Sequence, residues 1–591
     1  MELAVSIQQF DRGEAPNLMS SESSPEDSVR REHEVTAEYT PAGMRSLVLE
    51  ASAAGLRFVD RIFESVRERL DGGAGLPGAT TSGRARNGQP RGLVLRPALL
   101  GFAAMLAIAV GASLPSSPFK LEMPGVWFFG VPSSGGPSRW GVYFVLAAVY
   151  GGLLLLMRVW WGMTRLYSRC PGVPLNRMMW VFALWSLPML VIAPLFSRDA
   201  YSYAAQGEMV SHHMNPYLYG PFQLGNNSYT APVDNLWGNA PAPYGPLFLQ
   251  LDGFFARITF HNELATIVLL RLLSLVGVLL IAACVPRLAR LYHRDGAEVF
   301  TLMVLNPVTI LHLIGGAHND ALMLGLLIAG LTAAKEKRPI VGIVLCALAT
   351  AIKAPAAVGM LYVGWSWLGS RASTRDRIRP VVTAGLIGAG VLGFFSYVSG
   401  LGWGWVTILG TPGAVRSWTA PTTSLALVFA GIAHFAHIGA GLGGVLTATR
   451  LLGLLTATVA AVWLLLNSDR IGTLKALGIT LLLFVVLGPV VQPWYLSWGL
   501  ILLAPVALGR LRSLIIGLSM VTAFIELPGG TQLLNSLIHG DPLLIVLTLL
   551  WILVVLTVPL ATWERSEPAP PGGLAAATAT ATAELTSVPA V

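Results

Sequence analysis

Residues 265–285 have the sequence A-T-I-V-L-L-R-L-L-S-L-V-G-V-L-L-I-A-A-C-V, in which Arg271 is the one charged side chain. A helix of about 20 apolar residues, each adding about 1.5 Å, crosses the hydrocarbon core of a bilayer. Similar runs recur along most of the chain without the polar face that a soluble helix of this length needs. Because lipid tolerates only a backbone that closes its own hydrogen bonds, the sequence predicts an all-α polytopic membrane protein.

The overall composition agrees with this class. Of 591 residues, 54% are hydrophobic and 12% are charged, whereas soluble domains carry about 25% charged residues. The net charge of +8 comes from short basic patches between apolar runs, which are typical of cytoplasmic loops and not of a nucleic-acid partner. Cys170, Cys284 and Cys346 lie in a basic loop and in apolar runs, so we expect all three to be unpaired.

The apolar runs predict about 13–15 transmembrane helices. The predicted spans lie near residues 97–115, 140–162, 178–197, 265–285, 299–316, 319–334, 340–353, 354–369, 380–399, 446–467, 476–491, 495–509, 512–527 and 541–562. With the N-terminus in the cytoplasm, the basic loops between these spans also face the cytoplasm. A further crossing at 421–440 would move Arg470 and Lys475 outside, so this run is predicted to be re-entrant or interfacial.

Two polar ends flank the predicted transmembrane domain of residues 94–562. Residues 1–93 predict a cytoplasmic disordered arm, with an amphipathic helix near 44–71 that either lies on the inner membrane surface or packs one face in solution. Residues 563–591 are a low-complexity Ala/Thr/Pro tail, predicted to be disordered and cytoplasmic. We therefore expect a multi-pass protein of the plasma membrane with both termini inside.

The loop of residues 198–263 is the longest outer stretch between spans, and long loops are usually functional. It begins S-R-D-A-Y-S-Y-A-A-Q-G, continues through H-H-M-N-P-Y-L-Y-G-P and returns through A-P-Y-G-P-L. Its candidate site residues are Arg198, Asp199, Tyr201, Tyr203, Gln206, Asn215, Tyr217 and Tyr244. A structural alternative stays open, in which Arg198 and Asp199 form an ion pair at a helix end and the tyrosines lie in the interfacial aromatic belt.

Further polar residues fall at the outer ends of later spans. His318, Asn319 and Asp320 open a span in G-G-A-H-N-D-A-L, where Asn or Asp could also serve only as a helix cap. Lys353 lies in apolar sequence at the junction of two spans, where a lysine is costly unless it reaches water or an anion. Arg271 lies about 10 Å into its span and could reach the interface, pair with Asp320 or bind a ligand phosphate.

A last outer helix end has the sequence V-V-Q-P-W-Y-L-S-W, with Gln492, Trp494 and Tyr495 as candidate residues. Together, these motifs resemble the GT-C class of membrane glycosyltransferases, with a large outer first loop. More narrowly, S-R-D-A-Y-S-Y-A-A-Q-G with N-P-Y and Q-P-W-Y resembles the actinobacterial polyprenol-phosphomannose-dependent α-1,6-mannosyltransferases. The resemblance covers roughly residues 95–560, and the long charged arm resembles that of the mannopyranosyltransferase B branch.

The resemblance implies an inverting transfer of mannose from polyprenyl phosphate mannose to a growing α-1,6-mannan, the core of lipomannan, on the outer face of the membrane. Such a reaction needs one carboxylate as general base, because phosphate leaves without strong acid help. Asp199 is the expected base, Asp320 the second candidate and Asp252 the third. The resemblance also implies donor phosphate binding by Lys353 and His318, assisted by Arg198 or Arg271.

The remaining candidates are expected to bind sugar, acceptor or prenyl chain. They are Tyr201, Tyr203, Gln206, Asn215, Tyr217, Tyr244, Asn319, Asp320, Gln492, Trp494 and Tyr495. No metal or other cofactor is assigned, although Asp199 could hold a divalent ion if folding brought Asp320 or Asp252 beside it. A transporter or flippase of a lipid-linked sugar is the alternative function, and a non-catalytic membrane partner is a third; transporters, however, place polar residues near the midplane of paired repeats.

Overall fold

The computed structural model describes residues 92–114, 117, 138–410, 413, 419–437 and 441–524. All of them belong to one unit, Arg84–Val591. The predicted arm with its amphipathic helix, the span near 541–562 and the tail lie outside the described residues. Within the described part of the chain every element is a helix, which confirms the all-α class.

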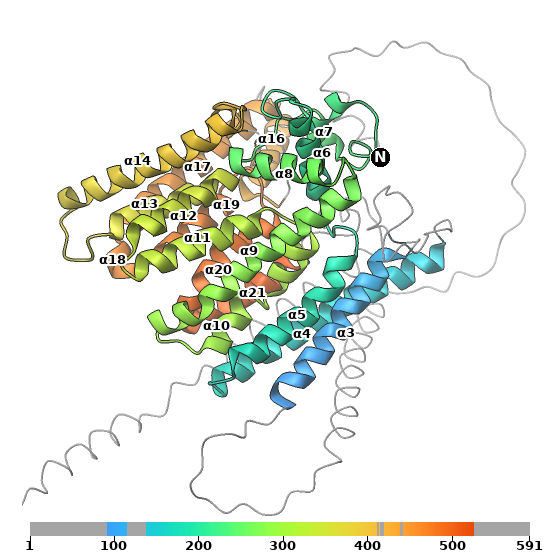
Figure 1. Ribbon diagram of the computed structural model, residues 1–591, viewed down its shortest axis with the longest axis horizontal. Helices are drawn as coiled ribbons and strands as arrows, with labels where there is room; N and C mark the ends of the chain where they lie inside the picture. The colour runs from blue at the N-terminus through green and yellow to red at the C-terminus, as the bar shows by residue number, and fades with distance from the viewer. Residues whose placement is uncertain are drawn as a thin grey trace, which may run out of the picture. The chain divides into compact units, whose positions relative to one another are not determined.

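The first half of this part begins with three apolar helices and continues with the segment around residues 198–263 that was predicted to face outside, which is called the outer segment below. The three helices are α3 (Gly92–Ser113), α4 (Arg139–Arg169) and α5 (Leu175–Val191). The outer segment contains α6 (Asp199–Ser211), η1 (Pro221–Leu224), α7 (Asn235–Gly238) and α8 (Pro246–Ile258). Figure 1 shows α6, α7 and α8 gathered at one end of the helical domain.

The second half supplies the rest of the bundle. Its elements are α9 (Glu263–Leu291), α10 (Gly296–Met303), η2 (Thr309–Gly315), α11 (Asp320–Lys335), α12 (Pro339–Ile352), η3 (Ala354–Ala356), α13 (Ala357–Ser366), α14 (Thr374–Val398), α15 (Gly404–Thr407), α16 (Pro421–Phe435), α17 (Leu442–Leu466), α18 (Ser468–Ile471), α19 (Thr473–Val486), α20 (Pro493–Leu503), η5 (Ala504–Val506) and α21 (Gly509–Thr522).

The described helices include five that are long and apolar enough to cross a membrane, or six if the bent pair η2 and α11 forms one span. Shorter apolar helices fall on most of the other predicted spans, so the total of 13–15 crossings stays a prediction. The prediction of one continuous span at 299–316 was wrong. The chain there is divided into α10 and η2, because Pro307 lies between them and has no N–H to donate.

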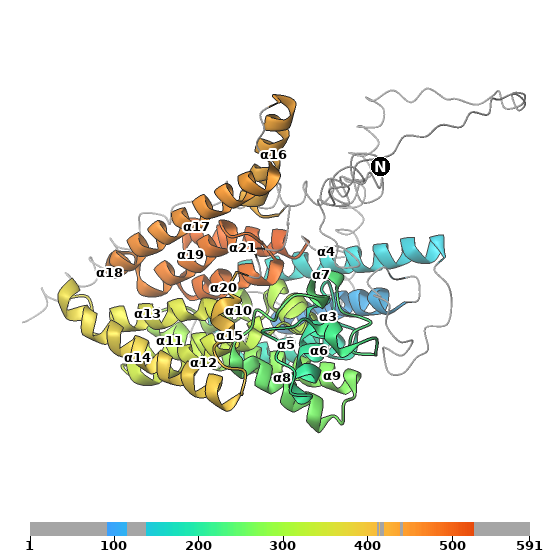
Figure 2. The ribbon, with the colours of Figure 1, turned by 90° about the horizontal axis from the view of Figure 1, so that it is seen from above.

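The run predicted to be re-entrant or interfacial forms α16, which projects away from α17 and α19 in Figure 2. Its outward side chains Val428, Phe429 and Ile432 are large, apolar and exposed. At its start, the Thr422 hydroxyl donates to the Gly488 carbonyl at 2.8 Å. Whether α16 crosses the bilayer stays a prediction.

Close helix packing positions the start of α11, which carries three candidate site residues. Gly277 of α9 lies against the backbone of Ala321 on α11, and Gly325 of α11 lies against the carbonyl of Gly277. A Cβ on either glycine would collide with backbone atoms, so only small residues allow this approach. The outer segment is joined in the same way, since Gly207 of α6 lies against the backbone of Asp252 on α8.

Candidate active site

Helix α6 brings Asp199 to the site. Residues 200–210 of this helix are buried, whereas the Asp199 side chain in its first turn is 14% exposed. Ser197 accepts the Asp199 backbone N–H at 3.1 Å, which fixes the start of the helix. Burial raises the pKa of Asp199 to about 6 although Lys353 lowers it, and the carboxylates of Asp320 and Asp234 raise it further. Asp199 is therefore a carboxylate whose protonation changes near neutral pH.

The break between η2 and α11 supplies the second part of the site. The two helices meet at an angle of 116°, and Ala317 within the break has a left-handed φ of 54°. Such backbone is costly and is often found at functional sites. The break buries His318, whose ring stacks on Trp494 with centroids 3.8 Å apart. His318 Nδ1 lies 3.5 Å from Asp199 Oδ2, so the break and the start of α6 meet at these two side chains.

Lys353 and Asp320 form a buried ion pair beside this contact. Lys353 follows the end of α12 in an extended conformation, and its Nζ lies 3.0 and 2.8 Å from the two oxygens of Asp320. Trp498 Nε1 donates to the same carboxylate at 2.6 Å. The side-chain oxygen Oδ1 of Asn319 accepts a hydrogen bond from Lys353 at 3.4 Å, and the buried side-chain nitrogen Nδ2 of Asn319 has no hydrogen-bond partner among the described residues. Asp320 is thus fully engaged, while Asn319 retains a donor for a ligand.

Aromatic rings enclose the lysine. The Lys353 ammonium lies 4.6 Å from the ring centroid of Tyr495, 5.7 Å from that of Tyr244 and 5.6 Å from that of Trp498. Tyr203 extends this wall, with its ring 5.0 Å from Tyr244 in an edge-to-face arrangement. Rings in such positions stabilise the cation and offer faces on which a sugar can stack.

The other predicted residues of the outer segment support this wall. The Tyr217 hydroxyl donates to the Tyr244 carbonyl at 3.0 Å, and the Tyr217 backbone N–H donates to Asn215 at 2.9 Å. Tyr201 and Gln206 are buried within α6. The structure therefore brings Asp199, His318, Asn319, Asp320, Lys353, Tyr203, Tyr244, Trp494 and Tyr495 together, while Asn215 and Tyr217 act through a neighbour. Gln492 is the N-cap residue of α20, and its buried side-chain oxygen Oε1 has no hydrogen-bond partner in the described part.

Arg271 has a different environment. Its guanidinium donates to the carbonyls of Ile192 and Gly315, and it lies 3.4 Å from the carbonyl of Leu190. These carbonyls belong to the segment before Asp199 and to the break before His318. Asp320, the pairing partner considered for Arg271, is paired with Lys353 instead. Arg271 therefore has a structural role that the sequence did not predict, since it links the segment before Asp199 to the break before His318. A contact between Arg271 and the donor phosphate stays a prediction.

Several contributors were missed by sequence analysis. Trp498 follows Trp494 by one helical turn in the quoted Q-P-W-Y-L-S-W motif, and this i, i+4 spacing on α20 was a usable signal. Phe248, which packs against Tyr203 with centroids 5.1 Å apart, resembles any core aromatic in sequence. Asp234 affects Asp199 only through the fold of the outer segment.

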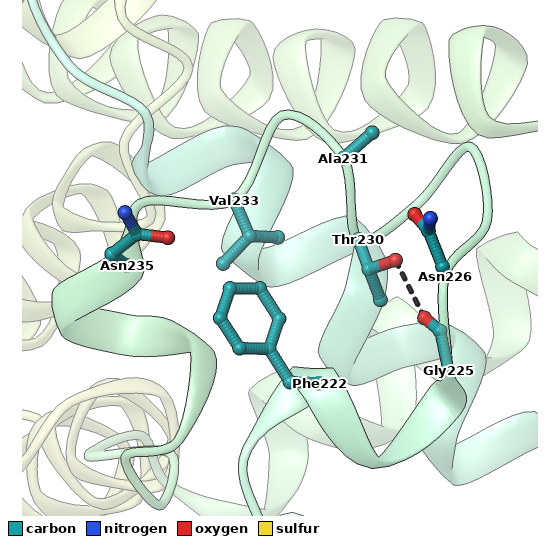
Figure 3. A pocket seen from close by; sticks show the side chains of 7 residues that line it. All are labelled: Phe222, Gly225, Asn226, Thr230, Ala231, Val233 and Asn235. Carbon is teal, nitrogen blue, oxygen red and sulfur yellow. Dashed lines mark hydrogen bonds between the residues drawn. The ribbon is translucent and has the colours of Figure 1, made fainter.

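A pocket of about 400 Å³ lies in the outer segment near Asp234. Figure 3 shows the side chains that line it: Phe222, Gly225, Asn226, Thr230, Ala231, Val233 and Asn235. The Thr230 hydroxyl donates to the Gly225 carbonyl at 2.7 Å and stabilises one wall. Ligand pockets are about 300–1,000 Å³, so this volume suits a sugar residue.

Two models of known protein families match this chain. Residues 98–369 match the model "Alpha-(1->6)-mannopyranosyltransferase, N-terminal domain", and residues 422–561 match "MptB C-terminal domain". The chain belongs to the alpha-(1->6)-mannopyranosyltransferase family. The first match contains Asp199, His318, Asp320 and Lys353, and the second contains the aromatic residues of α20. The resemblance inferred from the sequence is thereby confirmed.

Individual family members match over most of their length. Alpha-(1->6)-mannopyranosyltransferase A of Mycobacterium tuberculosis is 32% identical over 468 residues, which cover 75% of this chain and 86% of that protein. Alpha-(1->6)-mannopyranosyltransferase B of Corynebacterium glutamicum is 30% identical over 467 residues, which cover 74% and 77%. A probable alpha-(1->6)-mannopyranosyltransferase of Mycolicibacterium smegmatis is 32% identical over 448 residues, covering 69% and 78%. No solved structure matches the chain.

Proposed function

We propose that the protein transfers mannose from polyprenyl phosphate mannose to a growing α-1,6-mannan of the lipomannan type on the outer face of the plasma membrane. The names of its relatives support mannosyl transfer and the α-1,6 linkage. The lipid donor and the acceptor are proposed from the resemblance of the sequence motifs to the polyprenol-phosphomannose-dependent enzymes. One observation carries the catalytic assignment: Asp199 is a partly exposed carboxylate beside a buried cluster that holds a lysine and a histidine.

Asp199 fits the role of general base better than the other two carboxylates. Asp320 is 0% exposed and its two oxygens already accept hydrogen bonds from Lys353 and Trp498, so it is not accessible to an acceptor hydroxyl. Asp252 is also 0% exposed, and burial raises its pKa well above the usual range, which keeps it protonated. Asp199 alone among the three is open to a substrate and has a pKa close to neutral pH.

In the proposed step, Asp199 accepts the proton of the acceptor hydroxyl, while the oxygen of that hydroxyl forms a bond to the anomeric carbon of mannose. The bond from that carbon to the phosphate oxygen breaks, and the phosphate leaves with the electron pair. Attack opposite the leaving group converts a β-linked donor into an α-linked product. Lys353 supplies a fixed positive charge and His318 a ring nitrogen where the phosphate charge develops, and Arg198 at the start of α6 assists. No cofactor takes part in the proposed step.

The aromatic side chains around Lys353 are the proposed binding surface for the mannose of the donor. Tyr203, Tyr244 and Tyr495 surround Lys353, so a mannose stacked on them lies beside the cation that meets its phosphate. The pocket around Asn235 is assigned to the acceptor, because Asp234 next to it is close enough to influence Asp199. Donor and acceptor then approach Asp199 from different elements.

The test uses the purified full-length protein in lipid vesicles with labelled polyprenyl phosphomannose and a short α-1,6-mannoside. Transfer with inversion, seen as a new α linkage in the product, is expected from the native protein. The Asp199→Asn variant is expected to lose transfer, whereas Asp252→Asn, the same substitution at a fully buried aspartate, is expected to retain it. Movement of the lipid donor across the vesicle without any transfer would instead make the protein a flippase.

A further inference from the structure

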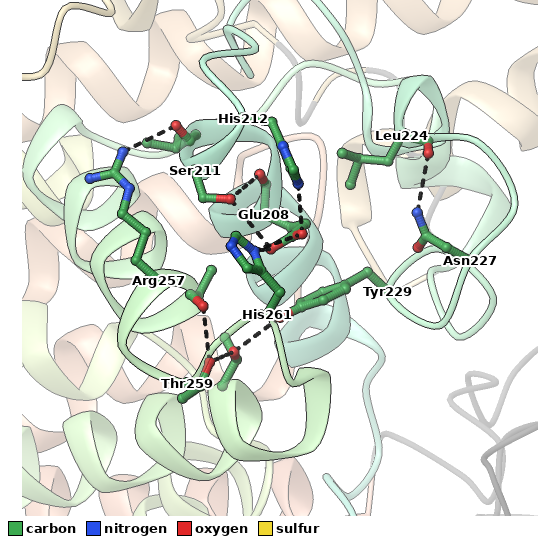
Figure 4. Close-up of polar contacts among 12 residues, drawn as sticks. Glu208, Ser211, His212, Leu224, Asn227, Tyr229, Arg257, Thr259 and His261 are labelled. Atoms are coloured by element: carbon green, nitrogen blue, oxygen red, sulfur yellow. Dashed lines mark hydrogen bonds and ion pairs between the residues drawn. The ribbon is translucent and has the colours of Figure 1, made fainter.

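A second polar cluster lies at the opposite end of α6 from Asp199. Glu208 in the last turns of this helix contacts two histidines: His212 Nε2 lies 2.9 Å from Oε1, and His261 Nδ1 lies 2.9 Å from Oε2. Figure 4 shows both rings pointing toward the one carboxylate. Glu208 and His212 are one turn apart on α6, while His261 comes from the turn between α8 and α9. Three potential metal ligands from two elements therefore converge on one point.

The cluster has the combination of burial and access that a metal site needs. The Glu208 side chain is 8% exposed, whereas His212 and His261 are 55% and 48% exposed. One ligand atom of each residue, a carboxylate oxygen or an imidazole nitrogen, lies within 4.8 Å of the other two. The described residues contain no other group of three His, Cys, Asp or Glu side chains arranged in this way. The carboxylate is thus fixed in the protein while one side of the cluster remains open to solvent.

The backbone holds His261 in place. Its φ of 60° lies in the left-handed region, which is costly for a side chain other than glycine. The His261 N–H donates to the Ala256 carbonyl at 2.9 Å, so the turn is fixed by hydrogen bonding within the α8 end. The ring stacks on His212 with centroids 5.3 Å apart. This arrangement directs the His261 Nδ1 atom toward Glu208.

Hydrogen bonds between the two imidazoles and the carboxylate account for these distances, but the same three groups are also a suitable set of metal ligands. Ligand atoms bound to one tetrahedral zinc at about 2.0–2.1 Å lie about 3.3 Å apart. The present nitrogen-to-oxygen distances of 2.9–3.0 Å need to open by only a few tenths of an ångström, and the exposed histidines can move. Imidazole nitrogen with one carboxylate oxygen suits Zn²⁺ and related transition metals, whereas Mg²⁺ and Ca²⁺ prefer oxygen ligands alone.

We propose that Glu208, His212 and His261 bind one divalent transition metal ion, for which Zn²⁺ is the best match, with a fourth position open to water or a ligand. The ion joins the end of α6 to the turn between α8 and α9. Glu208 lies nine positions after Asp199, a helical rise of about 14 Å, so the ion lies outside the transfer step. Its role is to hold the helix that carries Asp199, and the site is independent of the proposed sugar donor.

The test is zinc binding by the full-length protein in detergent after removal of bound metal with a chelator. Titration with ZnCl₂, followed by calorimetry and by metal analysis after desalting, is expected to give one ion per chain. The affinity is expected to fall at least about 100-fold in His261→Ala and in His212→Ala, because each removes a direct ligand. His213→Ala is the matched control, since this neighbouring exposed histidine is not part of the cluster.

Two further measurements guard against misfolding and non-specific binding. Zn²⁺ is expected to raise the unfolding temperature of the native protein and of His213→Ala but not of His261→Ala. Co²⁺ bound in place of zinc is expected to give the visible absorption of a tetrahedral site in the first two proteins only. The proposal is overturned if the native protein binds no stoichiometric zinc, or if His261→Ala binds it as tightly. Neither result depends on whether the protein transfers mannose.

Discussion

Each end of α6 places a carboxylate beside histidine, but the two carboxylates have different surroundings. At the first end, Asp199 is partly exposed and lies 3.5 Å from one histidine, with a pKa of about 6. At the last end, Glu208 lies 2.9 Å from each of two histidines and also contacts the Ser211 hydroxyl at 3.4 Å. A carboxylate with an open lone pair can accept a proton from a substrate. One surrounded by fixed nitrogen donors can hold a metal ion. The neighbouring side chains, and not the type of residue, therefore distinguish the proposed base Asp199 from the proposed metal ligand Glu208.

Between these ends α6 meets a third carboxyl group. Gly207 lies against Asp252 of α8, whose oxygens have no hydrogen-bond partner among the described residues. Burial keeps this group protonated, because ionisation without a partner is costly in the interior. Three carboxyl groups with different surroundings therefore lie along α6: Asp199 and Glu208 belong to this helix, and Asp252 belongs to the neighbouring α8.

The largest loss of transfer is expected for Asp199→Asn, which tests whether Asp199 differs from the other carboxyl groups along α6. Removing the proposed base while keeping the shape of the side chain is expected to lower the rate of mannosyl transfer by about 10²–10⁴-fold. Single-turnover transfer from labelled polyprenyl phosphomannose measures this change, after insertion and abundance have been matched to the native protein. A rate within tenfold of native would move the base to another residue.

Lys353→Gln tests whether the first end of α6 depends on the buried cation. The substitution removes the charge that pairs with Asp320 and lies among the tyrosine rings, so transfer is expected to fall about 10²–10³-fold. The Asp320 carboxylate also loses its partner, and therefore thermal unfolding must be measured in parallel. Native stability together with native activity would remove Lys353 from the site.

A pH profile sharpens the difference between Asp199 and an ordinary surface aspartate. Because the pKa of Asp199 is raised to about 6, the base is protonated and inactive below this pH and becomes available as pH rises through it. Transfer at pH 5 is expected to be about tenfold below its plateau, falling about tenfold per unit further down. If the acidic limb lies instead near pH 4, the environment assigned to Asp199 is wrong.

The smallest effect is expected for Asp252→Asn. The native carboxyl is protonated and buried without a partner, so an amide of similar size changes neither charge nor shape substantially. Transfer is expected to stay within about threefold of native, measured beside Asp199→Asn in the same vesicles. A loss as large as that of Asp199→Asn would show that Asp252 takes part in the reaction.

Much of the site could be predicted because charged and polar residues in apolar sequence are costly and require a reason. Lys353 stood out on that ground, and His318 and Asp320 through their position at the predicted outer start of a span. The structure places the three in one cluster. Their partnerships could not be predicted. Lys353 and Asp320 are 33 positions apart, and the bent helix pair that joins them to Asp199 depends on packing of α9 against α11.

Sequence by itself determined that this is an all-α membrane protein and that its polar clusters lie at the ends of apolar helices, because the cost of exposing backbone and charge to lipid is local. Tertiary structure decided which carboxylate is open, why Arg271 binds carbonyls, and that His261 meets Glu208 across 53 positions. Those outcomes depend on burial and on neighbours distant in the chain, since the chemistry of a side chain is set by the groups around it.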